Sequence, residues 1–200
     1  MTDSAEAPER SGRRQDKRER LIAAACQVMY AQGVEKTTLA DIAAAAGIPL
    51  GNVYYYFKTK DALADAVFDH HQGALESGFA HVMRHAAPAD RLAAVLESYA
   101  EEAKSVADHG CPYGSLNFET GKARGPLAKR AAALFSLQLD WFAAQFREMG
   151  QAKSEAIESS QAVLSLIQGA FLVGHALKDP EIIRRRLRAL AREVRAEGES

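Results

Sequence analysis

The chain has 200 residues, of which 48% are hydrophobic and 26% charged, and its formal net charge is −1. This composition is typical of a globular protein and excludes a largely disordered chain. Residues 1–10 lack the apolar core of a secretory signal, so we expect a cytoplasmic protein. The apolar stretch 162–177 is interrupted by polar residues, which favours a buried helix over a membrane span.

The cysteine and histidine patterns argue against a structural metal or a disulfide. Cys26 and Cys111 are the only cysteines, too few for a zinc motif or a disulfide framework. His81 and His85 lie four residues apart, but no thiol or carboxylate nearby in sequence completes a site, so an exposed helix end is favoured over metal binding. We expect no cofactor and no bound metal.

The charges are distributed unevenly along the chain. Residues 10–60 contain nine Lys or Arg and four Asp or Glu, whereas the residues after 60 contain sixteen and nineteen. A basic N-terminal module on a mildly acidic body is typical of a nucleic-acid binder with a separate regulatory part. Solvated helix faces are an alternative that charge alone does not exclude.

Helices are predicted from the first ordered residues onward. Alanine is abundant and the β-branched alternation of strands is nearly absent, which predicts an all-α protein. A flexible basic arm is expected over residues 1–14, with Arg13 and Arg14 either contacting DNA phosphate or simply starting a solvated helix. The first helix is predicted from Gln15 to Gln32, and Gly33 ends it.

The next segment predicts a helix-turn-helix. A short helix is expected over residues 39–46, a turn at Gly47-Ile48-Pro49, a second short helix to Phe57 and a third helix start near Lys60. Two short helices across a tight glycine-containing turn are typical of this DNA-binding motif.

Local signals support this motif. Thr38 is the expected N-cap of its first helix, with Asp41 in the capping-box position. A small apolar seam is expected to fix the angle between the helices, formed by Ile42, Ala46, Ile48, Val53 and Phe57.

Further helices are predicted over residues 61–85, 88–108, from 112 onward, 126–149, 153–177 and 180–195. The sequence is therefore divided into a DNA-binding domain at 15–60 and a helical regulatory and dimerisation domain at 61–195. The tail 196–200 is expected to fray.

The helix-turn-helix segment resembles the N-terminal signature of the TetR/AcrR class of bacterial transcriptional regulators. The resemblance covers about residues 15–67, and further on only the number and length of the helices support it. Pro49 departs from the family pattern, but proline is tolerated in a first helical turn. The matching residues are Thr38, Ile42, Ala43, Ala46, Gly47, Ile48, Gly51, Val53, Tyr54, Phe57, Lys60 and Leu63.

The resemblance and the residue chemistry together suggest a DNA-binding surface. The second helix of the motif is short enough to enter a major groove, where Gly51 permits close approach and Asn52 offers an amide to a base edge. Three consecutive tyrosines cannot all be core residues, although packing of the small domain is the alternative. The candidate DNA-binding residues are Thr38, Gly51, Asn52, Tyr54, Tyr55, Tyr56 and Lys60.

The last two helices carry apolar stripes at helical spacing. In the resembled family, the two corresponding helices of each subunit form a four-helix dimer interface. A two-fold dimer would place two recognition helices on the half-sites of a palindromic operator. Packing within the subunit is the alternative for part of each stripe. The predicted interface residues are Leu164, Ile167, Phe171, Gly174, Ile183, Leu187 and Leu190.

The resemblance also implies a ligand pocket within the second domain. Aromatic side chains with a few polar groups suggest a small, largely apolar effector, although most aromatic residues on helical faces are simply core. The candidate wall residues are Phe68, His71, Phe79, Tyr99, Cys111, Tyr113, Asn117, Phe135, Trp141, Phe142, Phe171 and His175.

Modification of Cys111 is a second way in which the protein could be released from DNA. Its position before Pro112 at a helix start predicts a lowered thiol pKa and therefore a possible sensor of oxidants or electrophiles. Packing under the loop is favoured, because no second cysteine is at hand to resolve an oxidised thiol. A glutaredoxin-like enzyme would need strands that neither flank of Cys111 contains.

The sequence thus predicts an all-α homodimeric regulator, a repressor released from operator DNA by a small molecule or by modification of Cys111, and not an enzyme. It also predicts no membrane association. The alternative is a helical thiol enzyme or ligand carrier that has no salt-dependent affinity for DNA.

Overall fold

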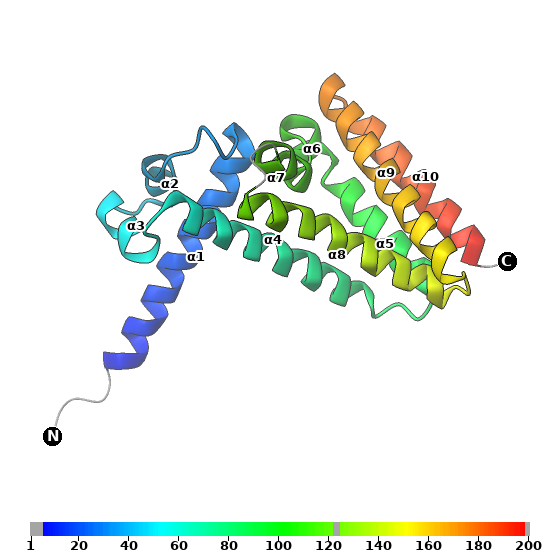
Figure 1. Ribbon diagram of the computed structural model, residues 1–200, viewed down its shortest axis with the longest axis horizontal. Helices are drawn as coiled ribbons and strands as arrows, with labels where there is room; N and C mark the ends of the chain where they lie inside the picture. Colours follow the sequence, from blue (N-terminus) through cyan, green and yellow to red (C-terminus); the bar gives the residue numbers. More distant parts are fainter. Residues whose placement is uncertain (1–5, 122–124, 199–200) are drawn as a thin grey trace. The chain divides into compact units, whose positions relative to one another are not determined.

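The computed structural model describes residues 6–121 and 125–198, with side chains from residue 15 onward. Across these residues it contains ten α-helices and no strand, which confirms the predicted all-α fold (Figure 1). The chain forms two compact units, residues 1–70 and 71–200.

The first unit contains α1 (Glu6–Gln32), α2 (Leu39–Ala46), α3 (Leu50–Tyr56) and the beginning of α4 (Lys60–Val82). Helix α1 begins earlier than the predicted Gln15, so residues 6–14 of the expected flexible arm are helical. The sequence of this stretch, EAPERSGRR, is rich in residues that tolerate a helix. Residues 1–5 of the arm lie outside the described residues.

The helix-turn-helix is held by the local signals that the sequence contains. The Thr38 hydroxyl accepts a hydrogen bond from the Asp41 N–H (3.2 Å), and the Asp41 carboxylate accepts one from the Thr38 N–H (2.9 Å). Gly47 adopts the left-handed conformation (φ 62°) that ends α2. All five residues of the predicted apolar seam are buried. The predicted capping box and seam are therefore confirmed.

Two arginines of α1 hold the motif in ways that the sequence did not indicate. Arg20 donates a hydrogen bond to the carbonyl of Ala46, the last residue of α2 (2.7 Å). The guanidinium carbon of Arg18 lies 5.4 Å from the centre of the Phe57 ring, a cation–π arrangement. These side chains act within the protein, so part of the basic charge of this unit has a structural role.

The second unit contains the end of α4 and six further helices: α5 (Pro88–Glu101), α6 (Ala103–His109), α7 (Pro112–Gly121), α8 (Pro126–Glu148), α9 (Lys153–Leu177) and α10 (Pro180–Gly198). The single helix predicted over 88–108 is divided at Glu102, where ψ is 1° and the N–H bonds to the Ala100 carbonyl instead of continuing the helical ladder. The other predicted boundaries agree closely.

Helix α10 extends beyond Arg195, where the sequence predicted a frayed tail. It packs against α5 and α9, and Figure 1 shows α9 and α10 side by side. Gly198 approaches Ala89 so closely that an added Cβ would lie 2.5 Å from the Ala89 Cβ. The Arg195 guanidinium also pairs with Glu97 (2.6 Å). These contacts with α5 are distant in sequence, which is why the terminal pattern did not reveal them.

The residues predicted as a dimer interface are buried inside the subunit. Ile167, Ile183 and Leu187 are fully buried, and the other four are nearly so. Gly174 allows Ile183 to approach α9, because an added Cβ would lie 2.4 Å from Ile183 Cγ1. The apolar stripes therefore hold α9 and α10 in the core of their own subunit. A partner would have to contact other residues of these helices.

Candidate nucleic-acid interface and ligand pockets

Helix α3 is anchored by one side and exposes the other. Val53 is fully buried and Phe57, directly after the helix, is nearly so. The opposite face is open: Tyr54 is 48% exposed and Tyr55 57%, while Gly51 and Asn52 are also exposed. The third tyrosine, Tyr56, is half-buried, and its ring meets Tyr55 edge-on at 5.1 Å. The tyrosines are therefore largely available to a partner, and the packing alternative does not explain Tyr54 or Tyr55.

The two remaining predicted DNA contacts are engaged within the unit. The Thr38 hydroxyl donates to the Asp41 carboxylate (2.7 Å). These hydrogen bonds from Thr38 hold the pKa of Asp41 below its ordinary value. Lys60 is half-buried and its ammonium donates to the Glu35 carbonyl (2.8 Å). Both residues thus have a structural role at the helix starts, and a phosphate would compete with the Lys60 contact.

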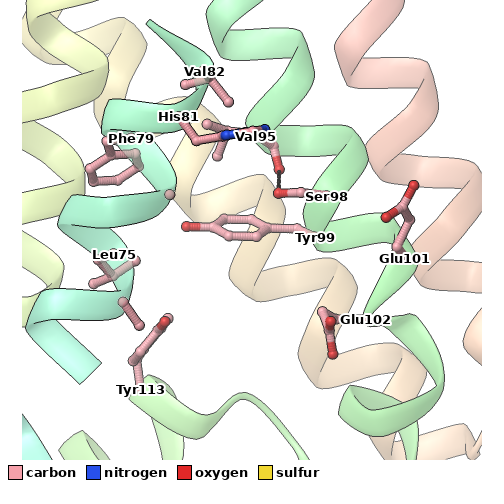
Figure 2. Close-up of a pocket in the computed structure, with 12 residues that line it drawn as sticks. Leu75, Phe79, His81, Val82, Val95, Ser98, Tyr99, Glu101, Glu102 and Tyr113 are labelled. Atoms are coloured by element: carbon pink, nitrogen blue, oxygen red, sulfur yellow. Dashed lines mark hydrogen bonds between the residues drawn. The ribbon is translucent and has the colours of Figure 1, made fainter. Parts of the chain in front are cut away.

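A pocket of about 300 Å³, here called the α4–α5 pocket, lies in the second unit. Figure 2 shows Tyr99 reaching from α5 toward Leu75 and Phe79 of α4, with Tyr113 of α7 completing the wall. Three of the predicted effector residues line this pocket: Phe79, Tyr99 and Tyr113. The other lining residues carry no distinctive sequence pattern and were not predicted: Ala74, Leu75, Gly78, His81, Val82, Val95, Ser98, Glu101 and Glu102.

The tyrosines of the α4–α5 pocket are neutral at physiological pH. Burial is the main cause that raises the pKa of Tyr99, and its hydroxyl donates to Gln138 Oε1 (3.2 Å). Burial likewise raises the pKa of Tyr113 to about 12. The His71 ring meets Tyr113 edge-on at 5.5 Å. The pocket therefore offers apolar and aromatic area with neutral hydroxyl groups, and the exposed side chains of Glu101 and Glu102 add two carboxylates to its lining.

A second pocket, of about 530 Å³, lies against α7 and α9 and is here called the Cys111 pocket. It brings together three of the predicted effector residues: Cys111, Phe171 and His175. The His175 ring is fixed by a hydrogen bond between Nδ1 and the Ala107 carbonyl (3.0 Å). The other lining residues, which the sequence analysis did not name, are Gly110, Gly114, Ser115, Phe118, Gln168 and Leu172.

The environment of Cys111 opposes the predicted lowering of its pKa. Its sulfur accepts hydrogen bonds from the Gly114 N–H (3.3 Å) and from Gln168 Nε2 (3.6 Å). These contacts favour the thiolate, but burial outweighs them and raises the pKa of Cys111. The prediction of an activated thiolate is therefore wrong in direction. Burial also raises the pKa of Cys26, to about 11.

The remaining predicted effector residues do not join either pocket. Phe68 is buried in the first unit, while Asn117 and Phe135 are half-buried in the second. Trp141 stacks on Phe79 at 4.4 Å and meets the fully buried Phe142 at 5.8 Å. The single pocket that the sequence suggested is thus divided into two pockets and an aromatic core.

Neither a metal site nor a membrane span provides a better account of these features. In the described parts of the chain, no three His, Cys, Asp or Glu side chains gather as a metal site. Helix α9 is long and apolar enough to cross a membrane, but by length and composition alone. Its inner stripe belongs to the core of the second unit.

The fold and the exposed face of α3 define a helix-turn-helix regulator of transcription. Comparison with known families agrees: residues 21–67 match the bacterial regulatory proteins of the tetR family, and residues 88–189 match the LmrA/YxaF-like transcriptional regulator C-terminal domain. The chain belongs to the TetR family, and it is a DNA-binding regulator, not an enzyme.

Relatives cover nearly the whole chain. The regulator LmrA of Bacillus subtilis is 27% identical over 82% of this chain and 89% of its own length. An uncharacterized regulator of Mycobacterium tuberculosis, Rv0196, is 27% identical over 88% and 94%. The solved structure of SCO4454, a TetR-family regulator from Streptomyces coelicolor, superimposes with a TM-score of 0.81 at 21% identity and covers 93% of this chain and 97% of that one. At this identity, the similarity to the SCO4454 structure supports the fold alone.

Proposed function

We propose that this protein is a cytoplasmic homodimeric repressor that binds a palindromic operator and is released by a small, largely apolar effector. The observation that carries the proposal is the exposed face of α3 in one unit together with a ligand-sized aromatic pocket in the other. Helix α4 is common to both: it begins in the first unit, and its residues 74–82 contribute to the pocket.

A two-fold dimer is supported by an apolar surface on α7 and α9. Phe118 and Leu172 are each 70% exposed. Exposing apolar side chains of this size to water is unfavourable and marks an interaction surface. Three more apolar residues in the second half of α9 are also exposed: Leu166, Val173 and Leu177. A second copy of the chain would cover this surface and give each operator half-site its own α3.

The effector is assigned to the α4–α5 pocket because of its contact with α4. Ligand binding changes DNA affinity only where it favours one conformation over another. A molecule seated against the later turns of α4 can alter the position of a helix whose first turn belongs to the DNA-binding unit. The neutral tyrosines and the apolar walls favour a largely apolar molecule.

Sedimentation tests the dimer. Leu172→Glu should yield monomers at concentrations where the wild-type protein is dimeric, because a buried interface does not accommodate an unpaired carboxylate. Met83→Glu is the control, since Met83 is 45% exposed and lies outside α7 and α9. A Leu172→Glu protein that remains dimeric would reject this interface.

The effector site can be tested before the natural effector is known. A panel of small apolar compounds is screened for those that raise the melting temperature and release bound operator. Gly78→Leu should fill the α4–α5 pocket and abolish both effects. Gly73→Leu is the matched control on the same helix, because a Cβ at either glycine meets no other atom within 4 Å. Equal responses of the two variants would place the effector elsewhere.

One substitution distinguishes release by an effector from release by modification of Cys111. Cys111→Ser should retain effector-dependent release, because the protonated, buried thiol is expected to act as a packing residue and cap of α7. Loss of release with unchanged ligand binding would support thiol modification instead.

Repression is tested in cells by a reporter whose transcription should rise when the protein is removed.

A further inference from the structure

We infer that α3 reads an A·T base pair in each operator half-site through Asn52, with Gly51 providing the clearance that brings the Asn52 amide to the base edge. This inference rests on the proposed operator binding and adds the identity of the base pair and the residue that selects it.

The geometry follows from the buried side of the helix. Successive helical residues are rotated by about 100°, so the direction opposite the buried Val53 is shared by Gly51 and Tyr55. Gly51 and Tyr55 are four residues apart and lie above one another on this line. Gly51 leaves the first turn of the outward face without a side chain, and a Cβ there would meet no other atom of the chain within 4 Å. The internal packing therefore gives no reason for glycine at this position.

Asn52 lies next to this gap. It is exposed, and within the described residues its side-chain amide has no hydrogen-bond partner. When the helix enters a major groove, the missing side chain at Gly51 reduces the distance between the α3 backbone and the bases. With the backbone this close, the short side chain of Asn52 can bring its amide to a base edge.

The chemistry selects adenine. An asparagine amide donates to adenine N7 and accepts from adenine N6, a bidentate pairing that no other base offers in the major groove. Guanine is usually read by Arg or Lys, and the sequence of α3, LGNVYYY, contains neither. Leu50 is 40% exposed, but it lies about 60° around the helix from Val53 and so borders the buried side. The exposed residues of α3 thus include one amide that can read adenine, at Asn52, and no arginine or lysine for guanine.

The test is selection from a random duplex library by the full-length protein, with wild type and variants processed in parallel. The wild-type motif should contain one position per half-site that is fixed as A·T. Asn52→Ala should lose preference at that position alone, and replacing that A·T pair by G·C should weaken wild-type binding by about 5- to 150-fold. The same replacement should have little effect on the variant. Asn117→Ala removes an identical amide from α7 and should select the wild-type motif.

The results that would overturn the inference are distinguishable from failure of the proposed operator binding. If wild type enriches a motif that Asn52→Ala retains unchanged, or if the position lost is a G·C pair, Asn52 does not read adenine although operator binding stands. If wild type enriches no motif at all, the proposed operator binding itself fails.

Gly51→Ala tests the clearance separately from the amide. Alanine is the better helix former and meets no atom within the chain, so this variant should be at least as heat-stable as wild type. It should nevertheless bind the selected operator at least about tenfold more weakly, a loss of about one pKd unit. Gly73→Ala in α4 is the control, with the same gain in stability and unchanged DNA affinity. Unchanged affinity of Gly51→Ala would overturn the clearance argument.

Discussion

The two units of this protein differ in where their functional side chains lie. In the first, a few buried residues and local caps hold the two short helices α2 and α3 against the long α1, so that polar and aromatic side chains of α3 remain outside. In the second, long helices bury large aromatic residues and leave pockets between them. The first unit is organised around an exposed surface and the second around its interior. Substitutions in the two units should therefore fail in different ways.

The largest loss of stability is expected from the aromatic interior of the second unit. Phe142 is fully buried against Trp141 and Phe79, so Phe142→Ala should lower the free energy of unfolding by about 3–5 kcal/mol. Trp141 is the only tryptophan, and its fluorescence during urea unfolding reports on this unit. Met83→Ala, at a half-exposed position, should change the value by less than about 0.5 kcal/mol. A loss below about 1 kcal/mol for Phe142→Ala would mean that this core is not tightly packed.

The contact between α9 and α10 gives the next largest effect. Gly174→Ala places a Cβ 2.4 Å from Ile183 Cγ1 and should destabilise the protein by about 1–3 kcal/mol. Gly169→Ala, on the same helix with no atom within 4 Å, should stabilise it by about 0.5–1 kcal/mol. Urea unfolding measures both. Two substitutions of the same sign would contradict the close approach of these helices.

The cap of α2 should contribute about 1 kcal/mol. Thr38→Ala removes the hydroxyl that receives the Asp41 N–H, and the loss should fall in the first unit. Thr38→Ser keeps the hydroxyl and is the control. Thermal unfolding followed by circular dichroism gives the change. A Thr38→Ala protein as stable as the serine variant would show that the observed capping box does not stabilise α2.

The smallest effect is a dependence on pH at the end of α10. Hydrogen bonds from Arg195 lower the pKa of Glu97 below its ordinary value. Its carboxylate therefore stabilises the fold above the ordinary glutamate pKa, and this contribution is lost as the pH falls through the lowered folded-state pKa. Both side chains are more than a third exposed, so solvent screens the pair and the effect is small. The difference in unfolding midpoint between wild type and Glu97→Gln should shrink from pH 7 to pH 3. A difference that is constant with pH would refute the pairing.

The comparison also explains what the sequence could and could not predict. Thr38, Asp41, Gly47 and the apolar seam interact within a few residues of one another, so their roles were readable in the chain. The stripes of α9 and α10 were equally regular, but periodicity shows that a face is buried and not which neighbour buries it. Gly174 and Ile183 meet inside the subunit, so the stripes are buried there, and the residues that a partner would contact stay a prediction.

The pockets and Cys111 show the same limit. Tyr99 and Tyr113 could be selected as aromatic residues, whereas Glu101 and Glu102 line the same pocket without any pattern that marks them. For Cys111, its place before a helix predicted a lowered pKa. Burial, which depends on tertiary packing, raises the pKa instead, although Gly114 and Gln168 donate hydrogen bonds to the sulfur. The local signals around α2 were thus reliable, whereas the start of α1, the break at Glu102 and the assignments that depend on packing were not predicted correctly.

The most direct test of the account is the binding of the full-length protein to the DNA directly upstream of its own reading frame, across a salt series and against excess unrelated duplex. The account predicts tight binding that resists the unrelated duplex, weakens steeply as salt increases and is lost in Asn52→Ala far more than in Asn117→Ala. If binding disappears equally with any competitor, and a random duplex library yields no motif either, the exposed face of α3 does not recognise an operator and the central claim is contradicted.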